Sequence, residues 1–281
     1  MVDSPSCVLC SCSQTQFWWE HKGFPFYCCS DCDLLFLAQT SLQEAMDRNK
    51  EIYDGIGQKV VEKVEEHQAG KREKHFAILR RLEPYRRTGK ILDIGCGQGG
   101  FLRSAQERGW EPEGVELAPH LAKFVREHYS IPVHVGTLED LELEEGSYDV
   151  IFFNELLEHI PQPRPFLTKV YSLLRFGGAI FLRTRNHRSF SASFCQEKWK
   201  ELPFFSKGHV CFYSPSTMKW IFPQLGFRLR SLRTWGVSLH PRFASDTVGY
   251  RLAKVANKIM DPFAKIFRKG HRIEVLALKN K

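Results

Sequence analysis

Short apolar runs alternate with amphipathic stretches along the chain from Lys90 onward. Strands are predicted at 91–94, 113–117, 132–135, 148–153 and 178–183, and helices at 101–108, 119–128, 165–175 and 214–225. The run YDVIFF at 148–153 is continuously apolar, which is typical of a strand buried on both faces. Repeated strand–helix alternation predicts an α/β fold with a doubly wound, mostly parallel sheet.

Two later segments, 227–234 and 272–279, alternate between apolar and polar residues. This period of two predicts an antiparallel strand pair that closes the edge of the sheet. We divide the chain into an N-terminal module at 1–40, a helical connector at 41–88 and a main domain at 89–281. The connector is expected to break at Gly70, and the main domain to carry inserts at 187–213 and 237–271.

Six of the nine cysteines lie between positions 7 and 32. Cys7-x-x-Cys10 and Cys29-x-x-Cys32 are two pairs of ligand spacing, separated by 18 residues, and four thiolates in this arrangement can surround a tetrahedral Zn²⁺ ion. Cys12 and Cys28 can replace members of this set, so the pattern leaves open which four bind zinc. Four sulfur ligands leave no open coordination position, which favours a structural role.

The opening residues contain no secretory signal, and no apolar run is long enough to cross a membrane. We therefore expect a cytoplasmic protein whose thiols stay reduced, rather than a secreted module held by disulfides. Only Lys22 is basic within residues 1–38, so nucleic acid is not expected as a partner of the cysteine module.

A glycine-rich loop follows the first predicted strand of the main domain. Asp93 precedes Gly95, Gly97 and Gly100, and Glu116 ends the next strand. These glycines also satisfy the dinucleotide pattern G-x-G-x-x-G. Asp93 favours a different ligand, because a carboxylate at this place opposes a pyrophosphate and suits a cationic group. Glu116 can accept hydrogen bonds from ribose hydroxyls.

The order of several segments carries a resemblance to a known family. ILDIGCGQGGFL, GVEL, GTLEDL, YDVIFFNELLEHIPQPRPFL and GGAIFLRT resemble the class I methyltransferases that depend on S-adenosylmethionine (SAM). The resemblance implies SAM contacts from Asp93, Gly95, Cys96 and Gly97 at the methionine end, Glu116 at the ribose, Leu117, Thr137 and Leu138 around the adenine, and Asn154 near the reaction centre. Thr137 departs from the family, which often has an acidic residue there.

Asn154 is followed by an E-x-x-E-H pattern made by Glu155, Glu158 and His159. On a helix these three side chains share one face. The pattern resembles the metal-binding motif of ubiquinone-pathway O-methyltransferases and of small-RNA 2′-O-methyltransferases. It therefore implies a second divalent cation, with His209 as a further ligand. The alternatives are that His159 acts as an acid or base, or that the residues only support a turn.

The 187–213 insert is rich in aromatic residues. Its segment GHVCFY resembles a region of small-molecule methyltransferases whose histidine lies near the substrate. His209 and Tyr213 therefore join His159 and Glu155 as catalytic candidates. The alternative is an aromatic cluster that covers the sheet. The N-terminal segment likewise resembles zinc-ribbon-like modules that precede some small-molecule methyltransferase domains.

The formal net charge of +8 suits an acidic or phosphate-bearing partner without requiring one. We predict SAM-dependent methyl transfer to a small or carrier-linked acceptor of sugar or natural-product type. Oxygen is the favoured atom, with nitrogen and carbon as alternatives. An RNA methyltransferase and a non-enzymatic interaction protein with a SAM fold are the competing predictions.

The 237–271 insert contains apolar residues at near-helical spacing, interleaved with Lys and Arg and divided by Pro262. We favour a helix that docks on its own domain or on a second subunit in a homodimer. Contact with a membrane surface is the less favoured alternative.

Overall fold

The computed structural model describes residues 4–21, 23–38, 64–195, 199, 208–238 and 248–280. The first part of the predicted connector, 41–63, and parts of both predicted inserts lie outside these ranges. No helix within them is long and apolar enough to cross a membrane.

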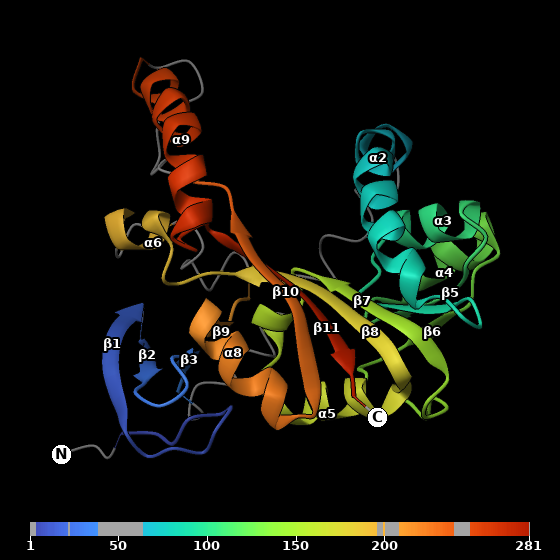
Figure 1. Cartoon of the computed structure of the whole chain (residues 1–281), viewed down its shortest axis with the longest axis horizontal. Coiled ribbons are helices and arrows are strands. Elements are labelled where there is room, and N and C mark those ends of the chain that lie inside the picture. Colours follow the sequence, from blue (N-terminus) through green and yellow to red (C-terminus); the bar gives the residue numbers. More distant parts are fainter. Residues whose placement is uncertain are drawn as a thin grey trace.

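A seven-stranded sheet forms the centre of the main domain (Figure 1). In spatial order its strands are β10 (Phe227–Trp235), β11 (Arg272–Lys279), β8 (Leu174–Arg185), β7 (Tyr148–Asn154), β4 (Lys90–Ile94), β5 (Glu111–Glu116) and β6 (Val133–Val135). The five strands from β8 to β6 are parallel, and β11 pairs antiparallel with both β8 and β10. The predicted fold class and the closing antiparallel pair are confirmed.

Helices cover both faces of this sheet. One face carries α2 (Val64–Leu82), which ends in the short 3-10 helix η3 (Glu83–Tyr85), and α3 (Gly100–Glu107), with α4 (Pro119–Tyr129) packed beside α3. The opposite face packs α5 (Pro163–Leu173) and α8 (Pro215–Gln224). Ile78 and Leu79 of α2 meet Val150 and Phe181 of the sheet in a buried cluster. This packing fixes α2 above the carboxyl edge of the parallel strands.

The N-terminal module has its own sheet, made of β1 (Thr15–His21), β2 (Phe24–Cys29) and β3 (Leu35–Leu37). Its fourth strand is β9 (Cys211–Phe212), which comes from the 187–213 insert, with Leu35 opposite Phe212. Buried residues of the module and of the main domain form one continuous cluster. The module is therefore built into the main domain.

Two predicted helix breaks are wrong. α2 runs through Gly70, and α9 (Val248–Ile266) runs through Pro262. A glycine inside a helix costs only about 1 kcal/mol relative to alanine, which the buried face of α2 outweighs. Contacts with residues outside the helix stabilise the turn around Pro262. The Gly236 amide donates to the Asp261 carboxylate at 2.7 Å, and Ala264 is fully buried.

Candidate active site

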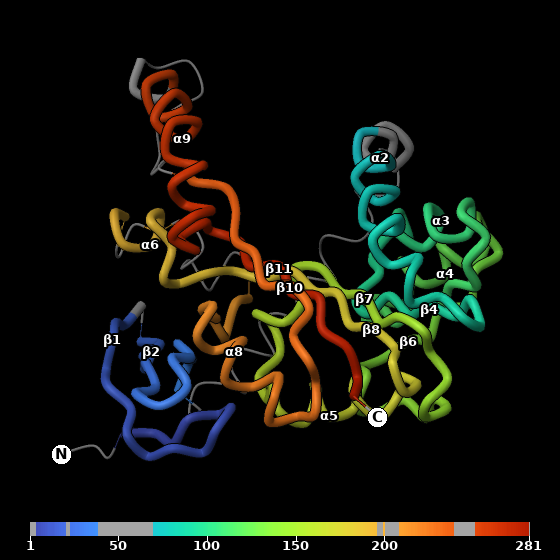
Figure 2. Tube along the Cα trace, in the orientation of Figure 1, coloured from blue at the N-terminus to red at the C-terminus, as the bar shows by residue number. Residues whose placement is uncertain are grey.

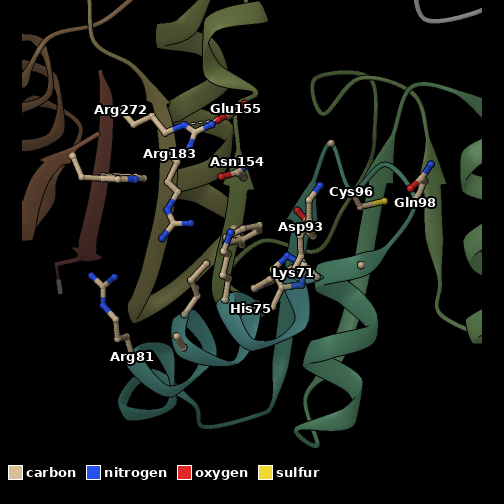
Figure 3. Close-up of a pocket in the computed structure, with 18 residues that line it drawn as sticks. Lys71, His75, Arg81, Asp93, Cys96, Gln98, Asn154, Glu155, Arg183 and Arg272 are labelled. Atoms are coloured by element: carbon tan, nitrogen blue, oxygen red, sulfur yellow. Dashed lines mark ion pairs between the residues drawn. The ribbon is translucent and has the colours of Figure 1, made fainter. Parts of the chain in front are cut away.

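A cavity of about 680 Å³ lies at the carboxyl edge of the parallel strands (Figure 3). The glycine loop after β4 forms one wall, α2 another, and the ends of β7, β8, β10 and β11 the third. The lining side chains that carry charge are Lys71, Lys74, Arg81, Asp93, Glu155, Arg183 and Arg272. This is the edge at which open α/β sheets bind their ligands.

The glycine loop has a backbone that other residues rarely adopt. Gly95 has a φ of +72° and Gly97 a φ of +54°, and a Cβ on Gly95 would lie 3.2 Å from Leu156. The Glu116 carboxylate accepts hydrogen bonds from the amides of Gly97 at 2.8 Å and Ala118 at 2.9 Å. Glu116 therefore fixes the shape of the loop from the end of the neighbouring strand.

Asp93 lies at the base of the cavity, at the end of β4. It is 4% exposed, and within the described residues its carboxylate has no hydrogen-bond donor. Burial, and then the charge of Glu116, raise the pKa of Asp93 well above its usual value. A bound cationic group would compensate this buried negative charge, so the residues present fit the ammonium group at the methionine end of SAM.

The predicted ribose and adenine residues lie beside the cavity rather than in its lining. Leu117 follows directly after Glu116 and is 50% exposed, so its side chain offers an apolar surface on which a base could pack. Thr137 donates from its hydroxyl to the Asp140 carboxylate at 2.6 Å, and Leu138 is buried. The structure thus brings Asp93, Gly95, Cys96 and Asn154 into the cavity lining, whereas Gly97, Glu116, Leu117, Thr137 and Leu138 are not among the lining residues.

Glu155 follows β7 and has a left-handed backbone, with a φ of +54°. Its carboxylate accepts hydrogen bonds from Arg185 at 2.6 Å and forms an ion pair with Arg272 at 2.9 Å. Such strained conformations of non-glycine residues concentrate at functional sites. Because two arginines hold its carboxylate, Glu155 does not join the other two residues of the E-x-x-E-H pattern.

Glu158 and His159 lie in the 3-10 helix η4 (Leu157–His159) and meet His209 from the 187–213 insert. One ligand atom from each residue lies within 4.8 Å of those of the others. Glu158 is fully buried, and its Oε2 accepts a hydrogen bond from the Thr184 hydroxyl at 2.8 Å. Its Oε1 has no hydrogen-bond partner in the described residues and forms an ion pair with Arg185 at 3.5 Å. Burial raises the pKa of Glu158 to about 7 and lowers the pKa of His159 to about 4. His159 is therefore neutral at pH 7.

His159 Nδ1 lies 3.1 Å from the Gly208 carbonyl oxygen, a contact that requires a proton on Nδ1. This tautomer leaves Nε2 as the basic nitrogen. A neutral imidazole and a buried carboxylate oxygen without a donor are ligand types that divalent cations use. The cluster differs from the predicted set of Glu155, Glu158, His159 and His209, because Glu155 is not part of it.

Tyr213 lies away from the cavity lining. It is fully buried, its hydroxyl donates to the Leu157 carbonyl oxygen at 3.2 Å, and burial raises its pKa well above the usual value. A tyrosine in this state supports η4 from below and exchanges no proton at neutral pH.

Part of the cavity lining could not be predicted from the sequence. Lys71, His75 and Arg81 reach the cavity from α2, Arg183 from β8, and Trp235 and Arg272 from the closing strands β10 and β11. Charged residues on a helix resemble a solvated surface in the sequence. Only the position of α2 above the sheet edge reveals the role of these residues as cavity lining.

The cysteine pairs meet in the N-terminal module. Cys7 Sγ lies 3.5 Å from Cys32 Sγ, and Cys10 Sγ lies 3.4 Å from Cys29 Sγ. All four sulfurs lie within 4.8 Å of one another, and none forms a disulfide. Four sulfurs bound to one zinc at about 2.3 Å would be separated by roughly 3.8 Å, so the cluster could hold zinc. Cys12 and Cys28 lie outside this group.

Comparison with known proteins places this geometry in a family. Residues 66–232 match the methyltransferase domain family. The chain is 38% identical over 115 residues to a ubiquinone biosynthesis O-methyltransferase of Xanthomonas axonopodis pv. citri, a match that covers 39% of this chain and 47% of the relative. The corresponding enzyme of Xanthomonas campestris pv. campestris is 39% identical over 104 residues, with 34% and 43% covered. The chain thus spans just under half the length of these curated relatives.

Solved structures give the same fold. A SAM-dependent methyltransferase from Archaeoglobus fulgidus superposes with a TM-score of 0.51 at 24% identity, covering 74% of this chain and 94% of that one. A phosphoethanolamine N-methyltransferase of Haemonchus contortus, in complex with SAM, gives 0.51 at 20% identity, with 74% and 53% covered. The family match spans more than half of the chain, and the cavity lies where this fold binds its ligands. The chain belongs to the methyltransferase domain family.

Proposed function

We propose that the chain transfers the methyl group of SAM to an oxygen atom of a small, negatively charged acceptor. The observation that carries this proposal is the Glu158, His159 and His209 cluster, which does not itself line the cavity but is linked through Arg185 to Glu155 of the cavity lining. An oxygen nucleophile must lose a proton, and this cluster offers the chemistry to remove it. The ubiquinone biosynthesis relatives, which are O-methyltransferases, support the same choice.

SAM supplies an electrophilic methyl group on a sulfonium when bound. We assign its methionine end to Asp93, Gly95, Cys96, Gly97 and Asn154, its ribose to Glu116, and its adenine to Leu117, Thr137 and Leu138. Asp93 would hold the ammonium group, and the loop amides would approach the ligand closely because Gly95 and Gly97 have no side chains. The role of the protein is largely to position the two reactants.

We assign a divalent cation to Glu158, His159 and His209. The buried Glu158 Oε1 has no hydrogen-bond donor within the described ranges, so it could bind such an ion in addition to its ion pair with Arg185 at 3.5 Å. A cation at this place would lower the pKa of an acceptor hydroxyl and orient it. His159 and His209 would serve as ligands, and Glu155 would hold Arg185 and the cavity-lining Arg272 in place.

The charge of the cavity supports a negatively charged acceptor. The lining contains five cationic side chains and two carboxylates: Lys71, Lys74, Arg81, Arg183 and Arg272 against Asp93 and Glu155. Arg81 and Arg183 share one buried carboxylate, Glu274, at 2.6 and 2.7 Å. Two cations against one anion leave a positive charge that a phosphate or carboxylate group can neutralise.

We also propose that Cys7, Cys10, Cys29 and Cys32 hold a structural zinc ion. Their four sulfurs leave no position for a substrate.

The test uses purified protein, SAM and matched pairs of hydroxylated compounds, one neutral and one carrying a carboxylate or phosphate. We expect S-adenosylhomocysteine and a methyl ether to form in equal amounts, faster with the anionic member of each pair. Mass spectrometry locates the new methyl group. A product methylated on nitrogen or carbon, or a preference for the neutral members, contradicts the proposal.

A further inference from the structure

Helix α9 stands away from the sheet, at the opposite end of its carboxyl edge from α2 (Figures 1 and 2). Six large apolar side chains of this helix and its last turn are between 54% and 74% exposed: Leu252, Val255, Ile259, Phe263, Ile266 and Phe267. The first five follow each other at steps of three or four residues, so they share one face of the helix. We call these six residues the α9 apolar face.

The segment that carries the α9 apolar face is strongly basic. Residues 248–269 contain six cationic residues and one acidic residue: Arg251, Lys254, Lys258, Lys265, Arg268 and Lys269 against Asp261. Asp261 is already paired with Lys265 at 2.6 Å. An apolar face with such a basic surrounding suits the boundary between headgroups and acyl chains of an anionic membrane.

A second copy of the chain is a poorer partner for this face. Antiparallel or parallel pairing of two α9 helices would bring their lysines and arginines together, and like charges at short distance oppose association. Anionic headgroups offer the opposite charge to the same side chains, while the acyl layer accepts the apolar ones. Charge complementarity therefore favours a membrane surface over a second copy of the chain as the partner of the α9 apolar face.

The base of α9 is rigidly joined to the cavity wall. The helix lies between β10, which ends at Trp235, and β11, which begins at Arg272, and both of these residues line the cavity. Helix α6 (Phe190–Cys195) lies beside this base, since the Phe190 amide donates to the Lys269 carbonyl oxygen at 2.9 Å. α6 carries Phe194, which is 68% exposed.

We propose that α9 lies in the surface of a membrane with anionic headgroups and holds the cavity close to that surface. This inference goes beyond the proposed function, because it concerns where the enzyme sits and not what it methylates. It reverses the preference for docking within the protein, which the sequence alone favoured.

The test is flotation of the full chain with vesicles of phosphatidylcholine, or of phosphatidylcholine and phosphatidylglycerol in equal parts. We expect binding to the mixed vesicles that weakens as salt is added. The double variant Ile259→Ser, Phe263→Ser should bind at least about tenfold more weakly, since each lost side chain removes apolar area that would be buried in the acyl layer. Lys254→Glu, Lys258→Glu should abolish the preference for anionic lipid.

The matched controls are Phe176→Ser, which removes another aromatic side chain with 63% exposure, and Lys123→Glu on α4. Both should bind like the wild type. No binding of the wild type to either vesicle overturns the proposal, as does equal loss in the controls. A dimer in sedimentation experiments that Ile259→Ser, Phe263→Ser dissociates assigns the α9 apolar face to self-association and also overturns it.

Discussion

The two clusters of ligand-type side chains in this chain differ in how complete they are. The N-terminal cluster consists of four sulfurs at the distances expected around one metal ion, and it is enclosed by the module. The Glu158, His159 and His209 cluster has three ligands and is linked through Arg185 to Glu155 of the cavity lining. A complete ligand set stabilises structure, whereas an incomplete one leaves room for a reacting group.

The two clusters are also mechanically connected. His209 lies two residues before β9, which completes the module's sheet by pairing with β3. The Val210 amide donates to the Glu158 carbonyl oxygen at 2.8 Å, which links β9 to η4. The cysteine module therefore helps to position His209 of the proposed cation cluster. Loss of the first cluster should affect the second, whereas changes to the second should leave the first intact.

The largest expected effect is that of losing a cysteine ligand. Cys32→Ala removes a buried sulfur and should release zinc and lower the melting temperature by about 10 °C or more, because loss of a structural metal costs several kcal/mol. Methyl transfer should fall as well, since β3 no longer holds β9. Cys12→Ala is the matched control, with zinc content and melting temperature unchanged. If Cys12→Ala and Cys32→Ala had equal effects, the four-sulfur cluster would have no special role in stability, and its contrast with the second cluster would be lost.

The next effect isolates the incomplete cluster. Glu158→Gln keeps the shape of the buried side chain but removes its charge, and we expect turnover to fall by about 10²–10⁴-fold. Affinity for S-adenosylhomocysteine, zinc content and melting temperature should stay close to those of the wild type. Treatment with EDTA should remove activity, and addition of Mg²⁺ or Mn²⁺ should restore it. Full activity of this variant, or of the EDTA-treated enzyme, excludes the proposed cation.

The third prediction concerns Asp93 in the cavity, where one substitution should affect the affinity for SAM and the stability of the fold differently. Burial raises the pKa of Asp93, so its ionised form destabilises the folded protein at pH values above the unfolded pKa. Asp93→Asn should therefore unfold at the same or a higher temperature at pH 7, while binding SAM at least about tenfold more weakly. In the wild type, affinity for SAM should rise as pH increases through the raised pKa. Calorimetry at several pH values measures both the unfolding temperature and the affinity for SAM. If the affinity of the Asp93→Asn variant for SAM depended on pH in the same way as that of the wild type, this assignment would be contradicted.

The sequence predicted those parts of the molecule whose signal is local. The parallel sheet follows from its apolar runs, and the glycine loop with Asp93 and Glu116 follows from one short motif. The exclusion of Glu155 from the cluster was hidden, because it depends on Arg185 and Arg272, which approach from the paired strands β8 and β11, distant from Glu155 in the sequence. β9 was missed for the same reason: a strand of two residues forms only because β3 is already beside it.

The smallest expected effect concerns acceptor charge, and two neighbouring arginines of α2 allow a matched test. Arg81 lines the cavity and donates to Glu274, whereas Arg80 is exposed outside it. Arg81→Ala leaves Glu274 paired with Arg183 through two hydrogen bonds at 2.7 and 3.0 Å, so the fold should persist.

We expect the KM of the Arg81→Ala variant for an anionic acceptor to rise about tenfold, which corresponds to the loss of one charge-assisted hydrogen bond of about 1.5 kcal/mol. The turnover number and the KM for a neutral acceptor should change little, and Arg80→Ala should match the wild type. If both variants raise KM equally, the overall charge of α2 attracts the acceptor, and the Arg81, Glu274 and Arg183 group has no specific role.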